Sequence, residues 1–283
     1  MEDREQTAVD ALFAEALGAG ESRPRARGVL SRALDEQVLA SALRRAVPVA
    51  FLEEVASARP WSERPRVLAR VVLSPRAPQA LALRLVSGLY WRDLAEVAAT
   101  TRVPAAVRSR AESLLRDGLG DMRLGDRVTL ARLATPALLP GLLADSERQV
   151  AEAALLNPRL REEDLVAASA AKGERLRALL VERLGDHPHV GDVRGRGLMV
   201  GLEIVADRAT TAPFPRAERR TEAIVAAARE AGVLVYSGTG AANGVDGDTI
   251  LLGPPFVVTD DEMVRIADGV AAAVAAATPA GAE

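Results

Sequence analysis

One lysine is the first residue to consider for chemistry. Lys172 is the only lysine of the chain, so it carries the only side-chain amine that could form a Schiff base with a carbonyl compound. Arginine cannot take that part, because its guanidinium does not lose a proton at working pH. Leu176 follows Lys172 by about one helical turn. The expected placement is therefore a surface lysine whose stem lies along apolar neighbours.

The two histidines are candidates for metal binding. His187 and His189 flank Pro188, and both imidazoles are of a type that binds transition metals. A protein metal site needs three or four ligands, and the sequence offers no evident third ligand beside this pair. The chain has no cysteine, which excludes disulfides, thiolate ligands and cysteine nucleophiles together. We therefore expect no metal site, and we place both histidines in a loop that enters a strand.

The elements that would position such residues are clearest at 190–205, VGDVRGRGLMVGLEIV. Gly195 and Gly197 flank Arg196 and favour a tight reversal or a bulge, because glycine adopts positive φ without steric cost. The second half of the stretch has apolar residues with period two, which is typical of a strand with one buried face. These residues are Leu198, Val200, Leu202 and Ile204.

The rest of the C-terminal part predicts an α+β domain with a small, mainly antiparallel sheet covered by helices. A helix is expected at 216–232, followed by strands at 233–237 and 249–252. The loop 238–248 lacks the Gly-Lys-Ser/Thr of a phosphate cradle, so it is expected to connect a hairpin. The faces expected to be buried are Ile224, Ala227, Ala228 and Ala231 in this helix, and Met263, Ile266, Ala267, Val270 and Val274 in the last one.

Capping signals mark two further helices. Thr259 with Glu262 three residues on forms a capping box for the last helix, which contributes about 1 kcal/mol. Acidic residues at 162–164 suit a helix start, and Gly185 suits the end of the same helix. Its apolar stripe is expected at Leu176, Leu179, Leu180 and Leu184.

The N-terminal part reads as a series of short helices interrupted by proline. Short helices are marginal alone, so they must be stabilised by packing on neighbours. A weak internal similarity between 100–107 and 143–150 has a spacing within the roughly 40–47-residue period of HEAT and armadillo units. The stretch predicts an all-α, solenoid-like array with a concave binding face, and a plain helical bundle is the alternative. Trp61, Tyr90 and Trp91 fit either an interface cluster or core packing.

We expect two domains, at 1–165 and 166–283. The second resembles a known family over about 173–275, on the stretches 187–205 (HPHVGDVRGRGLMVGLEIV), 228–238 (AREAGVLVYSG) and 244–262 (GVDGDTILLGPPFVVTDDE). It is similar to the C-terminal small domain of class III pyridoxal-phosphate-dependent aminotransferases. The stretches 91–115 and 142–165 resemble HEAT-like or leucine-rich-repeat-variant helical repeats.

The aminotransferase resemblance implies a large domain that carries the phosphate-binding loop and the Schiff-base lysine. In this chain about 165 residues of other sequence precede the similar stretch, so no catalytic or cofactor-binding residue is assigned. Many relatives that act on ω-amino acids have an arginine where this chain has Leu251. By resemblance, the residues nearest a substrate are Arg194, Arg196, Gly197 and Tyr236; the alternative is that they only support the sheet.

Three functions follow as hypotheses. The favoured one is a non-catalytic interaction protein with a protein partner on the helical-repeat face. The second is half of a split transaminase, completed by a separate large-domain chain, with pyridoxal phosphate bound only in the completed enzyme. The third is a fusion or decay product without a selected role. The net charge of −3 and the lack of a long apolar stretch predict a cytoplasmic chain without nucleic-acid or membrane partners.

Overall fold

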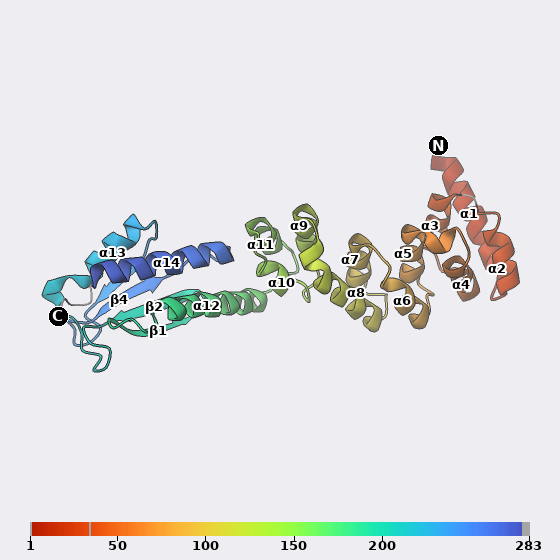
Figure 1. The fold of residues 1–283 in the computed structure, drawn as a ribbon. Helices are drawn as coiled ribbons and strands as arrows, with labels where there is room; N and C mark the ends of the chain where they lie inside the picture. The colour runs from red at the N-terminus through yellow and green to blue at the C-terminus, as the bar shows by residue number, and fades with distance from the viewer. Residues whose placement is uncertain (1, 34, 279–283) are drawn as a thin grey trace. The chain divides into compact units, whose positions relative to one another are not determined.

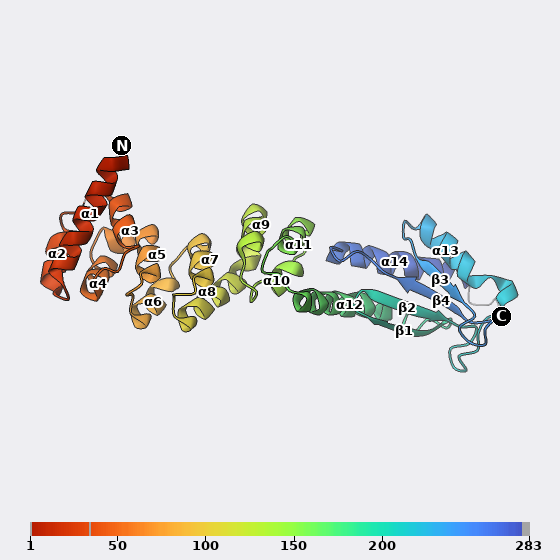
Figure 2. The same ribbon diagram turned by 180° about the vertical axis from the view of Figure 1, so that it is seen from behind.

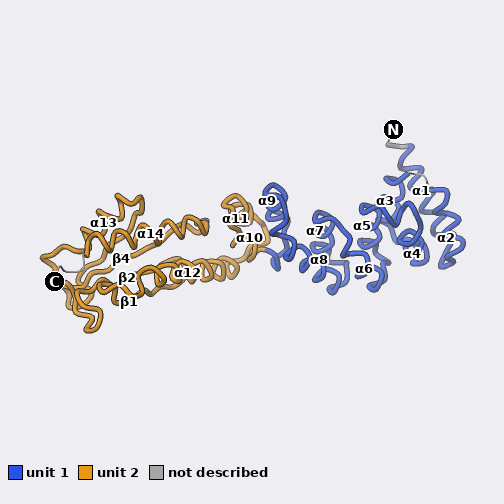
Figure 3. The backbone as a smooth tube through the Cα atoms, viewed as in Figure 1, with its two compact units in different colours: residues 1–138 blue, residues 139–283 orange. Residues whose placement is uncertain are grey.

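The computed structural model describes residues 2–33 and 35–278. The chain divides into two compact units, Met1–Leu138 and Leu139–Glu283, which Figure 3 shows in blue and orange. None of the helices in the described residues is long and apolar enough to cross a membrane. The domain limit expected at 165/166 stays a prediction.

Unit 1 is built from α-helices, as the sequence predicts. Neighbouring helices pack in order along the unit: α1, α3, α5, α7 and α9 follow one another, α2 packs on α4, and α6 packs on α8 (Figure 1). The bounds are α1 (Glu2–Ala19), α2 (Arg23–Leu30), α3 (Glu36–Ala42), α4 (Val49–Ser57), α5 (Pro65–Leu73), α6 (Gln79–Val86), α7 (Trp91–Ala99), α8 (Ala105–Gly118) and α9 (Leu124–Leu133).

A buried carboxylate links two helices of unit 1. The side chain of Glu54 on α4 is only 1% exposed, and it accepts hydrogen bonds from Arg23 Nε at 2.9 Å and Arg27 Nε at 3.0 Å. The hydrogen bond from Arg27 is the main cause that holds the pKa of Glu54 below its usual value. The pair of arginines on α2 thus satisfies a charge that α4 places in the core.

Unit 2 combines helices with one antiparallel sheet of four strands in the order β1-β2-β4-β3. The strands are β1 (Val190–Arg196), β2 (Met199–Ile204), β3 (Tyr236–Thr239) and β4 (Asp248–Leu252). The helices are α10 (Leu139–Leu143), α11 (Arg148–Leu155), α12 (Glu162–Leu184), α13 (Arg220–Glu230) and α14 (Asp260–Ala277).

The helices α12, α13 and α14 cover one face of this sheet. α12 packs on β1 and β2, α13 packs on β3 and β4, and α14 contacts both helices (Figure 1, and from behind in Figure 2). The apolar core lies between these layers and includes Leu176, Leu180, Val200, Leu202, Ile204, Ile250, Val270 and Val274. The small antiparallel sheet with helices over it confirms the α+β prediction for this part of the chain.

Local signals fix several of these boundaries. The Thr259 hydroxyl accepts from the Glu262 N–H, and the Glu262 carboxylate accepts from the Thr259 N–H, so the capping box of α14 is confirmed. α12 ends at Leu184 before Gly185, as expected. Other boundaries differ from the prediction: α13 begins at Arg220, β3 begins at Tyr236, and Ala231 is exposed because α13 ends one residue before it.

Candidate functional site

The uncovered face of the sheet brings together residues from all four strands. Arg194 pairs with Gly201, Gly201 with Leu251, and Leu251 with Tyr236 across the antiparallel ladder. Residues directly opposite each other in such a ladder point to the same face, so these four form one row. The Tyr236 side chain is exposed, as is Met199 in the adjacent row. The row therefore lies on the face opposite the helices.

Arg194 is held in place by two carboxylates on this face. Its Nη1 lies 3.0 Å from Asp192 Oδ2 and 2.9 Å from Glu203 Oε2. The hydrogen bond with Glu203 is the main cause that raises the pKa of Arg194, and the hydrogen bond with Asp192 is the second. The two carboxylates thus engage Nη1 and offset the positive charge that Arg194 presents on this face.

Arg196 and Gly197 occupy the reversal between β1 and β2. Arg196 pairs with Met199 and is exposed on the uncovered face. Gly197 has φ of +55°, and a Cβ placed on it would lie 2.7 Å from Ser169 Oγ on α12. Gly197 therefore serves the turn and its close approach to α12. Of the four residues singled out by resemblance, three lie on the open face and Gly197 lies in the turn at its edge.

A broad hollow of about 650 Å³ covers the middle of this face. Its lining includes Gly201, Met199 and Leu251, together with Arg194 and Arg196. The exposed apolar side chains of Met199 and Leu251 suit contact with an apolar surface of another molecule.

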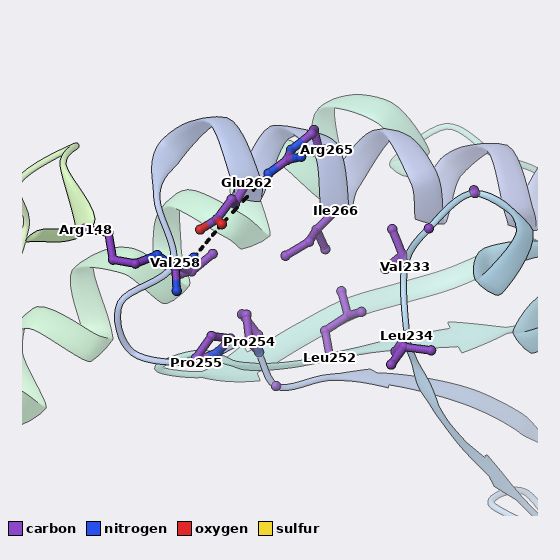
Figure 4. A pocket seen from close by; sticks show the side chains of 13 residues that line it. Arg148, Val233, Leu234, Leu252, Pro254, Pro255, Val258, Glu262, Arg265 and Ile266 are labelled. Atoms are coloured by element: carbon purple, nitrogen blue, oxygen red, sulfur yellow. Dashed lines mark hydrogen bonds and ion pairs between the residues drawn. The ribbon is translucent and has the colours of Figure 1, made fainter.

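A second hollow, about 560 Å³, lies between the start of α14, the end of β4 and the segment 231–234 that precedes β3. In Figure 4, Ile266 from α14 and Leu252 from β4 point toward each other across it, and Pro254 and Pro255 form its edge. Glu262 lies at the rim, where Arg148 Nη2 donates to its Oε1 at 2.5 Å. No local pattern in the sequence indicates this pocket, because its lining comes from three separate segments, Arg148, 231–234 and 252–266.

The pKa of Glu262 is lowered by its surroundings. The hydrogen bond from the Thr259 N–H is the main cause, and the ion pair with Arg148 adds to it. Arg265 lies 3.8 Å from the same carboxylate. The Glu262 carboxylate is thus engaged by the chain's own groups, the Thr259 N–H, Arg148 and Arg265.

Lys172 corrects the expectation of a surface lysine. The residue is 6% exposed, and its Nζ donates hydrogen bonds to the carbonyl oxygens of Phe256 at 2.8 Å and Val258 at 3.2 Å. The same Nζ lies 5.2 Å from the centre of the Phe256 ring, as a cation–π contact. Burial lowers the pKa of Lys172, and Asp260 and Glu262 counter that effect. The amine thus holds the loop between β4 and α14 onto α12.

The surroundings of Lys172 do not fit pyridoxal phosphate. The hollow beside the amine has a volume of about 120 Å³, whereas small-molecule sites usually have about 300–1,000 Å³. A Schiff base would also require Nζ to give up its two carbonyl acceptors, Phe256 and Val258. The residues around Lys172 therefore do not form a cofactor site.

The histidine pair lies in the loop before β1, as expected. His189 Nδ1 lies within hydrogen-bond distance of the carbonyl oxygens of Val205 and Ala206. The backbone N–H of His189 donates to His187 Nδ1 at 3.2 Å. Burial is the main cause that lowers the pKa of His187. No group of three or more metal-ligand side chains occurs within residues 2–33 and 35–278.

Comparisons with known proteins match the C-terminal part of the chain. Residues 142–274 match the family model described as Aminotransferase class-III. The taurine–pyruvate aminotransferase of Rhodobacter capsulatus is 37% identical over 115 residues, which is 41% of this chain and 24% of that protein. The adenosylmethionine-8-amino-7-oxononanoate aminotransferase of Nitratidesulfovibrio vulgaris is 39% identical over 110 residues, 39% of this chain and 19% of that protein.

Among solved structures, an (S)-enantioselective omega-transaminase from Thermomicrobium roseum matches with 34% identity and a TM-score of 0.37, covering 46% of this chain and 27% of that one. The chain spans about a quarter or less of the curated relatives it matches. The C-terminal part, residues 142–274, is therefore an aminotransferase class III-like domain. The match includes 142–165, which the sequence had assigned to the helical repeats.

Proposed function

We propose that this chain is an interaction protein. Its helical part is an array of HEAT-like repeats that presents a binding face to a protein partner, and its aminotransferase class III-like domain performs no transamination by itself. The observation that carries the second statement is the position of Lys172. The only side-chain amine is buried and donates to Phe256 and Val258, so it is not free to bond to a cofactor.

The packing order of unit 1 supports the array. Each odd-numbered helix from α3 to α7 contacts the odd-numbered helix on either side, and α2 with α4 and α6 with α8 run beside that row. Stacked helical units bury their apolar stripes against neighbours and leave a long surface open to partners. The proposal includes a cytoplasmic location without nucleic-acid or membrane partners, because a net charge of −3 gives no general attraction to anionic polymers or lipids.

A pyridoxal-phosphate titration tests the catalytic half of the proposal. The purified chain is titrated with the cofactor, reduced with borohydride and digested to map any adduct, while a complete class III aminotransferase serves as the positive control. We expect no saturable adduct at Lys172 and no transamination with an amine donor and a keto acid. A saturable adduct at Lys172 together with turnover would contradict the proposal.

A second candidate function is favoured by the uncovered sheet face. Met199 and Tyr236 expose 61% and 74% of their surface there, and Met199 and Leu251 line the hollow. An apolar face of this kind suits docking to a second polypeptide. In this account a separate large-domain aminotransferase chain covers the face and completes a pyridoxal-phosphate enzyme, pyridoxal phosphate being the cofactor that the family implies for complete enzymes.

Co-purification distinguishes the two candidates. The tagged chain is recovered from its native cells next to a Met199→Glu/Tyr236→Glu variant and a Val166→Glu control, which changes an exposed residue of α12. A split enzyme requires a large-domain aminotransferase chain that is retained by the wild type and the control and lost with the double variant. Recovery of no such chain in any sample leaves the first candidate.

A further inference from the structure

Two adjoining hollows lie along the starts of α5 and α7 in unit 1. One has a volume of about 530 Å³ and the other about 470 Å³, and both are lined by Glu36 and Arg64. Because Glu36 and Arg64 line both hollows, the two adjoin and form one surface. We call it the arginine groove and define it by Glu36, Arg59, Arg64, Arg66, Tyr90 and Arg92.

The lining of the arginine groove carries more positive than negative charge. Four arginines line the two hollows, against the carboxylates of Glu36 and Asp93. Arg59 is paired with Glu63 at 2.8 Å and Arg64 with Glu36 at 3.6 Å, so the surplus of positive charge lies on the other two arginines. Arg66 and Arg92 are exposed, and within the described part of unit 1 neither guanidinium has a carboxylate within ion-pair distance. The chain as a whole has a net charge of −3, so the sign of this surface is opposite to that of the whole chain. Unpaired guanidiniums favour carboxylate groups on a partner.

Contacts within the chain position several arginine and aromatic side chains of the groove. The ion pair between Arg64 and Glu36 is long, with 3.6 Å between Nη1 and Oε2, and its two residues line both hollows. The guanidinium of Arg92 lies 5.1 Å from the centre of the Trp91 ring, which supports it from one side. Tyr90 is 65% exposed beside it. Tyrosine and arginine are enriched at the centres of protein interfaces.

The helix starts add donors of the same sign. α5 and α7 have nine residues each, and no side chain caps their first turns. Their N-cap residues, Arg64 and Tyr90, both line the groove. The N–H groups at a helix start are unsatisfied by the helix and carry partial positive charge. At α7 these groups reinforce the preference that Arg66 and Arg92 set, whereas at α5 Pro65 has no N–H and the Val67 N–H is bonded to the Arg64 carbonyl.

We propose that the arginine groove binds an acidic peptide segment of a partner protein, with an apolar or aromatic side chain of that segment against Tyr90. The inference rests on the proposed function and specifies the chemistry of the partner. A peptide fits better than a nucleic-acid backbone, because Glu36 and Asp93 interrupt the positive groups. Separate positive positions match spaced carboxylates, whereas a phosphate backbone requires a continuous basic track.

The test measures binding of defined probes to the full chain. A fluorescein-labelled peptide, Glu-Glu-Trp-Glu-Glu-Leu, is compared by anisotropy with the same peptide bearing glutamine for glutamate, and with a labelled single-stranded oligonucleotide. The variants are Arg66→Glu/Arg92→Glu and the control Arg132→Glu, which reverses the charge of one exposed arginine of α9. All three substituted side chains are exposed, and circular dichroism checks that each variant is folded.

We expect the acidic probe to bind the wild type and the Arg132→Glu control alike. The double variant should weaken that binding by about tenfold or more, and added salt should weaken wild-type binding. The groove assignment is overturned if the acidic probe does not bind, if the glutamine peptide binds equally, if the oligonucleotide binds more tightly, or if the double variant binds like the wild type. Partner capture from native cells tests the proposed function separately, because a partner retained by the double variant would leave the interaction protein standing without this groove.

Discussion

Lys172 Nζ on α12 donates a hydrogen bond of 2.8 Å to the carbonyl oxygen of Phe256, in the loop that leads into α14. A second bond reaches the carbonyl of Val258 in the same loop. The residue that carries the chain's only side-chain amine thus joins two segments that are distant in sequence. This relationship turns the most obvious candidate for cofactor chemistry into a structural group.

Replacing Lys172 with methionine should destabilise the chain. The variant keeps an unbranched apolar stem but leaves the carbonyls of Phe256 and Val258 without their donor, which costs about 1–3 kcal/mol. Urea unfolding measures the change in the free energy of unfolding. The control is Arg175→Met, at an exposed position one turn along the same helix, for which we expect a change within about 0.5 kcal/mol. Equal changes in the free energy of unfolding for the two substitutions would show that the hydrogen bonds of Lys172 do not stabilise the fold.

Gly173 should be unable to accept even one methyl group. A Cβ at this position would lie 1.8 Å from the carbonyl oxygen of Gly197, which is backbone and cannot rotate away. Gly173→Ala should therefore lower the free energy of unfolding by about 1–3 kcal/mol, through overpacking between α12 and the β1–β2 turn. Gly28→Ala on α2 is the matched control, since nothing lies within 4 Å of a Cβ there. A helical alanine in open space should stabilise by about 0.5–1 kcal/mol. A neutral or stabilising Gly173→Ala would refute the close approach.

His187 predicts a pH dependence of stability. Its pKa in the folded chain lies below the usual value of 6.5, chiefly because of burial and secondly because of His189. The unfolded chain therefore binds more protons in the window between the folded pKa and 6.5, so stability falls as the pH decreases through that window. Urea unfolding at several pH values should show this slope in the wild type and a smaller slope in His187→Asn. An unchanged slope in the variant would assign the effect to other groups.

Glu54 should contribute more than its sequence neighbour. Glu54→Gln keeps the size of the side chain but removes the charge that Arg23 and Arg27 meet, and we expect a loss of about 1–3 kcal/mol. Glu53→Gln is the control, since Glu53 is 41% exposed and lies 3.8 Å from Arg23. Exposed pairs of this kind contribute about 0–1 kcal/mol. Thermal unfolding of both variants gives the comparison, and equal losses would contradict the special role of Glu54.

The sequence predicts the elements of this chain better than their contacts. The period-two pattern from Leu198 to Ile204 and the capping box at Thr259 are local signals, and the structure confirms both elements. The row of Arg194, Leu251 and Tyr236 depends on the strand order β1-β2-β4-β3, which no local pattern encodes. The helix predicted from 216 starts at Arg220, because a short 3-10 turn and Arg219 with positive φ precede it.

The placement of Lys172 could not be read from the sequence for the same reason. Its position one turn before Leu176 is compatible with a surface lysine and with a buried one. What decides the matter is a pair of carbonyl groups at Phe256 and Val258 that only the folded chain brings near. A buried amine without acceptors would be costly, and with acceptors it is stable. The periodicity of a sequence does not indicate which distant backbone groups will accept hydrogen bonds from a buried side chain.

The most direct test of the account is the chemical accessibility of the Lys172 amine. Reductive methylation followed by peptide mapping reports on two amines only, the chain's terminal amine and Lys172, so the result has a built-in reference. We predict that Lys172 in the folded chain reacts at least about tenfold more slowly than in the urea-unfolded chain, while the terminal amine reacts alike in both. Equal reactivity of Lys172 in the folded and unfolded chains would contradict its structural role and would make it available for cofactor chemistry.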